Sequence, residues 1–117
     1  MNCLMVDRNL ALYLVGNYIS ELESQEPDFK YSNRFEYDKW SAAKNAATAI
    51  YECIQEGYNP IYIVETYTAQ MAYYSQRANN SGKYLTSTIF SIESDTASDI
   101  ANLFTCNGIH YMENYIE

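Results

Sequence analysis

The stretch from Asn59 to Gln76, NPIYIVETYTAQMAYYSQ, decides between a helical and a mixed fold. Its first half is rich in β-branched and aromatic residues, which is typical of a strand. Asn59 and Pro60, however, match a helix start, in which an N-cap residue precedes proline at the first helical position. Apolar and aromatic residues then recur at steps of three and four, at Val64, Tyr67, Met71 and Tyr74. That is the period of an amphipathic helix, so the sequence predicts a helix over about 60–79.

Three further segments on either side of this stretch keep the same period, over about 8–24, 34–57 and 87–106. Their predicted core positions are Leu12, Val15, Ile19 and Leu22 in the first, Trp40, Ala43, Ala47, Ile50 and Ile54 in the second, and Ile89, Ile92, Thr96, Ile100, Leu103 and Phe104 in the last. Gly57 and Gly108 follow helical segments as C-terminal caps, and Gly82 lies in a polar loop. Asn33 and Glu36 have the spacing of a capping box.

These elements predict an all-α fold, a four-helix antiparallel bundle or a close variant, as a single domain over 1–117. The residues after Gly108 form a short C-terminal extension, for which a fifth helix and an edge strand both remain open. Within the predicted helices, Gly16 either lowers helix stability or permits a close helix crossing.

The chain is strongly acidic, with 15 Asp and Glu against 7 Lys and Arg and a net charge of −8. Such a charge disfavours direct binding of nucleic acid and of anionic membranes, and it fits a basic protein partner. No apolar run approaches the roughly 20 residues that cross a bilayer. The three cysteines show no Cys-x-x-Cys spacing, so we expect reduced thiols and a cytoplasmic location.

Residues for catalysis are scarce, because the chain has one histidine, His110, no zinc-site spacing and no glycine-rich phosphate loop. We therefore predict a non-enzymatic protein without catalytic residues, cofactor or metal. The alternative is a magnesium-dependent nucleotide hydrolase that uses the carboxylate pairs Glu52 with Glu56 and Asp95 with Asp99, each spaced for one helix face.

Tyrosine is unusually frequent, with 13 residues in the chain. Tyr67 and Tyr74 fall on the apolar stripe of their helix and are expected at the edge of the core. Tyr62 and Tyr73 fall off that stripe. Exposed tyrosines are common at protein interfaces, so these two are candidates for binding a partner, either a second copy or a basic groove.

The predicted fourth helix has a polar side and an acidic character. Its polar side carries Ser91, Ser94, Asp95, Ser98 and Asp99, and Glu93 lies nearer the apolar stripe. This side is either an ordinary hydrated face or a surface presented to a partner. The candidate partner-binding residues of the whole chain are Tyr62, Tyr73, Glu52, Glu56, Glu93, Asp95 and Asp99.

Two segments, NPIYIVETYTAQMAYYSQ and TIFSIESDTASDIANLF, resemble the C-terminal half of short uncharacterised proteins of bacteriophages and mobile elements of Gram-positive bacteria. The resemblance implies an accessory protein that acts on host machinery, and it carries over no catalytic residue. Many anti-CRISPR proteins of such provenance place carboxylates in the nucleic-acid groove of a nuclease. We therefore expect an inhibitor of a basic host protein such as a CRISPR nuclease, or alternatively a self-associating accessory protein.

Overall fold

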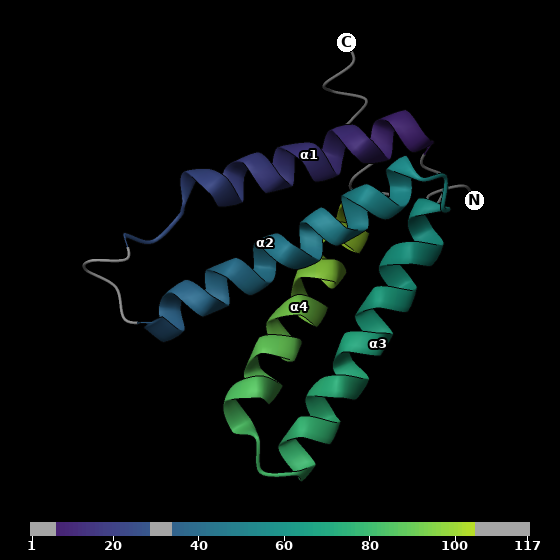
Figure 1. Cartoon of the computed structure of the whole chain (residues 1–117). Coiled ribbons are helices and arrows are strands. Elements are labelled where there is room, and N and C mark those ends of the chain that lie inside the picture. Colours follow the sequence, from purple (N-terminus) through teal and green to yellow (C-terminus); the bar gives the residue numbers. More distant parts are fainter. Residues whose placement is uncertain (1–6, 29–33, 105–117) are drawn as a thin grey trace.

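The computed structural model of the chain describes residues 7–28 and 34–104, and it is helical almost throughout these ranges. The helices are α1 (Arg8–Ser24), α2 (Arg34–Gln55), α3 (Pro60–Asn80) and α4 (Tyr84–Leu103) (Figure 1). The described ranges contain no strand, so the all-α prediction is confirmed, including a helix where NPIYIVETYT could have formed a strand. The predicted features at Asn33, His110 and the C-terminal extension lie outside the described residues.

The four helices form two antiparallel pairs, α1 with α2 and α3 with α4, and the pairs cross each other at a wide angle (Figure 1). The most extensive contact joins α3 to α4, followed by the contacts of α2 with α4 and of α1 with α2. The end of the α3–α4 pair that holds its connecting turn extends beyond α2 (Figure 1). Because the pairs cross, the helices share a core near one end of α3 and α4 and not along their full length.

The turn between α2 and α3 follows the predicted helix stop and start. Gly57 adopts a φ of +109°, and the N–H of Tyr58 donates to the carbonyl of Cys53 at 3.1 Å, which is the 6→1 bond of a Schellman motif. Two residues later the Asn59 side chain accepts from the N–H of Tyr62 at 3.0 Å, with proline in the first turn. Local capping chemistry therefore sets both helix ends.

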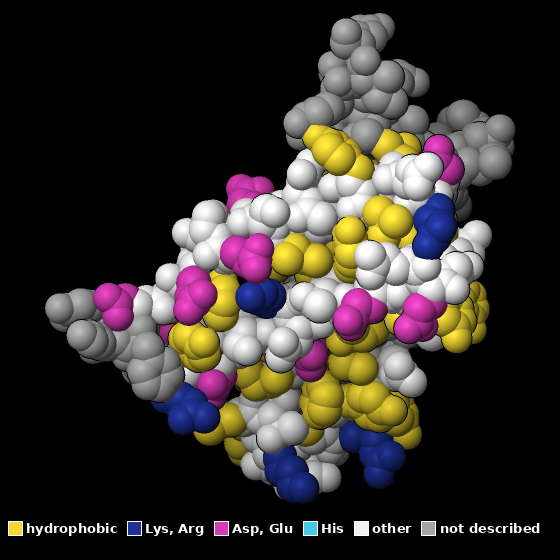
Figure 2. All heavy atoms as spheres, turned by 45° about the horizontal axis from the view of Figure 1, so that its top comes forward, with side chains coloured by type: hydrophobic (Ala, Val, Ile, Leu, Met, Phe, Trp, Pro, Cys, Tyr) yellow, Lys and Arg dark blue, Asp and Glu magenta, His cyan; other side chains and the backbone are white. Residues whose placement is uncertain are grey.

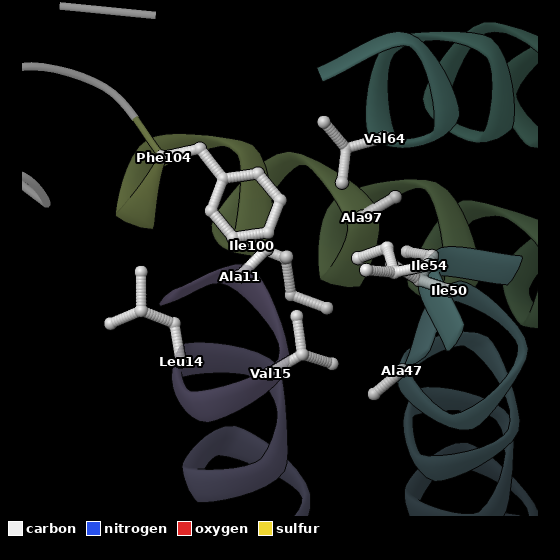
Figure 3. Packing of buried hydrophobic residues seen from close by; sticks show 10 residues of the cluster. All are labelled: Ala11, Leu14, Val15, Ala47, Ile50, Ile54, Val64, Ala97, Ile100 and Phe104. Carbon is white, nitrogen blue, oxygen red and sulfur yellow. The ribbon is translucent and has the colours of Figure 1, made fainter. Parts of the chain in front are cut away.

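The core lies where all four helices meet (Figure 3). Its buried members are Ala11, Leu14 and Val15 of α1, Ala47, Ile50 and Ile54 of α2, Val64 of α3, Ala97 and Ile100 of α4, and Phe104 at the α4 C-cap. Most predicted core positions lie in this cluster or pack against it. Ala11, Leu14 and Ala97 are core residues that the periodicity does not predict, because alanine is a weak hydrophobic signal and Leu14 lies beside the stripe of Leu12, Val15 and Ile19.

Tyr74 corrects the predicted stripe of α3, because its side chain is 38% exposed. It lies in the half of α3 that extends beyond α2, and there its ring contacts Phe90 of α4, with 5.4 Å between centroids. Tyr67, about two helical turns earlier on the same stripe, packs against the core as expected. The helical period of α3 is as predicted. The period does not show, however, that α2 does not extend over Tyr74.

Long-range hydrogen bonds from two side chains, Trp40 and Arg8, join α1 and α2 at the two ends of the pair. Trp40 of α2 donates its indole N–H to the carbonyl of Leu22 near the end of α1 at 2.7 Å. At the other end, the Arg8 guanidinium of α1 donates to the carbonyls of Ile54, at 3.1 Å, and Gln55. Arg8 therefore adds side-chain donors to two carbonyls in the last turn of α2 and places a positive charge at the negative end of its dipole.

Candidate functional site

Serines join α3 to α4 in the described structure, which corrects the prediction for Ser94 as part of the outer polar side of α4, whereas Ser98 is exposed as predicted. Ser94 is 8% exposed and donates to the carbonyl of Thr68 on α3 at 2.9 Å. Further along the same contact, the hydroxyls of Ser75 and Ser87 each lie 2.8 Å from the carbonyl of the other residue. Small hydroxyl side chains let the two helices approach closely while every hydroxyl keeps a partner.

The remaining polar side chains near this contact border a groove of about 320 Å³ between α3 and α4. The groove is lined by Ala72, Ser75, Gln76, Asn79, Ser87, Ser91, Ser94 and Asp95. Its serines at 75, 87 and 94 are already used in the helix contact, and Asp95 is its one charged residue. Of the predicted candidates, only Asp95 lies in this groove.

Tyr62 and Tyr73 are both exposed, at 60% and 56%, and they lie on the outer face of α3. They are separated by eleven residues, which is about three turns of 3.6 residues, so they point in nearly the same direction. Between them on this face are Thr66 and Ala69, both exposed. The Tyr73 ring also lies under the Arg77 guanidinium, 5.8 Å from its centroid. The two tyrosines, which the sequence placed off the apolar stripe, therefore share one exposed face of α3.

The two carboxylate pairs nominated from the sequence are exposed on different helices. Glu52 and Glu56 lie one turn apart at the end of α2, and Asp95 and Asp99 lie one turn apart on α4. Like charges at this spacing destabilise a helix by a few tenths of a kcal/mol. The Tyr18 hydroxyl lies 3.4 Å from an Asp99 carboxylate oxygen, which is long for a hydrogen bond. Among the described residues no three His, Cys, Asp or Glu side chains gather into a metal site.

Glu93 differs from the other acidic candidates because it is half-buried between helices. Burial raises the pKa of its carboxyl above the ordinary value, and a hydrogen bond with the Tyr67 side chain partly opposes that rise. Burial and the neighbouring Glu93 charge together raise the pKa of Tyr67 to about 12. The Glu93 carboxylate is therefore engaged inside the chain, between α4 and α3, and is less available to a partner than Asp95 or Asp99.

Charge is unevenly distributed over the chain. No Asp or Glu occurs between Glu65 and Glu93, and this segment carries Arg77 and Lys83. In the view of Figure 2, acidic side chains lie over the larger part of the molecule, while the protruding lower end shows basic and hydrophobic side chains. The described structure thus has an acidic body and a basic, aromatic tip.

Several acidic residues of the α1–α2 pair are compensated within the chain. Lys39 lies 2.9 Å from Glu36, Arg34 lies 3.2 Å from Asp38, and Lys44 lies 3.4 Å from Glu23 (all N to O). Exposed pairs of this kind contribute about 0–1 kcal/mol each. These ion pairs do, however, reduce the negative potential of that surface. None of the three involves Glu52, Glu56, Asp95 or Asp99.

No protein-family model, curated protein or solved structure matches this chain. The resemblance to phage and mobile-element proteins therefore stays a prediction. Within the described ranges, every helix is too short or too polar to span a bilayer.

Proposed function

We propose that this chain is a non-enzymatic protein-binding module that inhibits a bacterial nucleic-acid-binding defence factor, in the manner of anti-CRISPR proteins. Its acidic surface occupies the basic groove in which that factor holds nucleic acid. The observation that carries the proposal is two pairs of exposed carboxylates, Glu52 with Glu56 at the C-terminal end of α2 and Asp95 with Asp99 on α4.

The physical basis is electrostatic complementarity. A row of Lys and Arg that accepts phosphates also accepts carboxylates, and opposite potentials accelerate encounter. Each carboxylate pair opposes the stability of its own helix, so a cationic partner relieves a repulsion that exists in the free protein. The net charge of −8 acts in the same direction over a longer range.

The test measures how much of the purified chain halves the cleavage of target DNA by each of a panel of bacterial RNA-guided nucleases. The decisive variant combines Asp95→Asn with Asp99→Asn, and we expect it to require at least ~10-fold more protein, because two contacts to cations are lost. The matched control combines Glu36→Gln with Asp38→Asn. It removes the same charge from residues that already have Lys39 and Arg34 as partners.

Three further outcomes decide the proposal. Binding to an inhibited nuclease should weaken steeply between about 0.1 and 0.5 M salt, because the Debye length shortens over that range. Equal losses in the two double variants would show that net charge acts without a defined surface. A panel in which no nuclease is inhibited contradicts the proposal.

A further inference from the structure

The exposed residues on the outer face of α3 have the same spacing from its N-terminal end as from its C-terminal end. Tyr62, Thr66, Ala69 and Tyr73 are all exposed and follow one another at steps of four, three and four. These are the steps of the a and d positions of a coiled-coil seam. The pattern is symmetric about the point between Tyr67 and Thr68, with a large aromatic residue at each end and a small residue on each side of the centre.

A face with this symmetry is complementary to a second copy of itself in antiparallel orientation. When two such helices cross at the central point, Tyr62 of one copy meets Tyr73 of the other at both ends of the contact. Thr66 meets Ala69 at the middle, where small side chains allow the backbones to approach. A twofold interface requires this relation, in which residue i contacts residue j and j contacts i.

The charges on the chain agree with the antiparallel orientation and oppose the parallel one. Arg77 lies near the C-terminal end of α3, and Glu56 lies at the turn before its N-terminal end. In the antiparallel pair, position 77 of one copy lies opposite position 58 of the other. Arg77 of one copy therefore lies near the turn between α2 and α3 of the other copy, which contains Glu56. A parallel pair places the two Arg77 side chains together and the two Glu56 side chains together.

We propose that the outer face of α3 is the interface of a homodimer, in which α3 of one copy packs antiparallel against α3 of a second copy. The face is open for this contact, because Figure 1 shows α3 at one side of the described molecule, with α2 and α4 on its other side. A pair of single helices buries less than the roughly 800 Å² per partner of a standard interface, so we expect a dissociation constant in the micromolar range.

The dimer and the proposed inhibitory surface share Glu56, so the two proposals are tested at different residues. The carboxylates at Asp95 and Asp99 lie on α4, outside the α3 contact, and can be altered without touching it. A chain that dimerises but inhibits no nuclease therefore supports the dimer alone, and an inhibitory chain that stays monomeric supports the inhibitor alone.

Sedimentation equilibrium of the full chain between about 1 and 200 µM tests the dimer, and we expect a reversible monomer–dimer equilibrium. Ala69→Glu should weaken dimerisation at least ~10-fold, because each copy then places a carboxylate beside the centre of the contact. The position is exposed and glutamate is a good helix former, so the variant should keep the helical circular dichroism of the parent. The control Thr86→Glu adds the same charge at an exposed position on α4 and should leave the equilibrium unchanged.

Charge exchange tests the orientation. Arg77→Glu and Glu56→Arg should each weaken the dimer, and the double variant should recover most of the loss, because the opposite charges again face each other across the twofold axis. A monomer at every concentration, or an Ala69→Glu variant that dimerises like Thr86→Glu, would overturn the interface. A double variant that fails to recover would overturn the antiparallel register.

Discussion

At the scale of single residues, Glu93 shows how the environment changes the role of a side chain. From the sequence it belonged with the acidic candidates of α4, yet the structure places it half-buried with Tyr67 and with the thiol of Cys53 close to that tyrosine. A carboxyl in this position is harder to ionise than one in water. Its contribution to stability consequently depends on pH.

The native state holds the Glu93 proton to a higher pH than the unfolded state does, because its pKa is raised from 4.5. Stability contributed by this group is therefore present at low pH and is lost as pH rises from about 4.5 through the raised pKa. Glu93→Gln should increase the free energy of unfolding at pH 7 by roughly 0.5 kcal/mol after allowance for partial exposure, and by much less near pH 4. Urea unfolding at the two pH values measures this difference.

The control for that prediction is Asp95→Asn, which removes an exposed carboxylate from the same helix. If both variants gain the same stability at pH 7, relief of net negative charge explains the result, and the burial of Glu93 does not.

At the scale of secondary-structure elements, glycine in a helix and glycine after a helix have opposite roles in this chain. A Cβ at Gly16, inside α1, would lie 3.6 Å from the Tyr51 ring, which is an ordinary van der Waals contact. The crossing of α1 and α2 therefore leaves room for a methyl group. Gly57, in contrast, has a φ of +109°, a conformation that other residues rarely adopt.

We expect Gly16→Ala to raise the free energy of unfolding by about 0.5–1 kcal/mol, because alanine loses less conformational freedom in a helix. Gly57→Ala should lower it by about 1 kcal/mol, since the Schellman turn needs a left-handed residue. Thermal unfolding followed by circular dichroism measures both. A loss of stability in Gly16→Ala would mean that the α1–α2 crossing tolerates no added atom at this position.

At the scale of the whole molecule, one arginine fastens the first helix to the end of the second. Arg8→Ala should lower the free energy of unfolding by about 1 kcal/mol, because the guanidinium donates to two terminal carbonyls and opposes the dipole of α2. Arg8→Lys retains the charge but not the paired donors, and it should lose a smaller amount. Urea unfolding of the three proteins measures the order, and equal stability of all three would show that water replaces Arg8 without loss.

Local sequence signals predicted the helices well, since capping and periodicity act within a few residues. The Asn59–Pro60 start and the Gly57 stop are confirmed, and α1 occupies the predicted range. The beginning of α4 was placed three residues late, at 87, because Tyr84, Leu85 and Thr86 are exposed and lie in the part of the α3–α4 pair that extends beyond α2. Periodicity detects a helix by its buried side and is weak where little is buried.

The candidate site was predictable only in part. The exposure of Tyr62 and Tyr73 could be predicted, because the sequence of α3 alone shows that both residues lie off its apolar stripe. That they share a face with Thr66 and Ala69 became evident from the exposure of all four side chains. The sequence placed Asp95 and Asp99 on the polar side of their helix and Glu93 nearer the apolar stripe, as the structure has them, but it did not show that Tyr67 is the partner of Glu93.

The sequence by itself determined the number of helices, their main boundaries, most of the core and the excess of negative charge, because each depends on neighbouring residues or on composition. Only the packing of the helices shows that Ser75, Ser87 and Ser94 join α3 to α4 and that Arg8 donates to the end of α2. Each of these depends on which helices meet and how far each extends over the next. A serine has the same local pattern on a wet face and at a close helix contact, and only the neighbouring helix distinguishes the two.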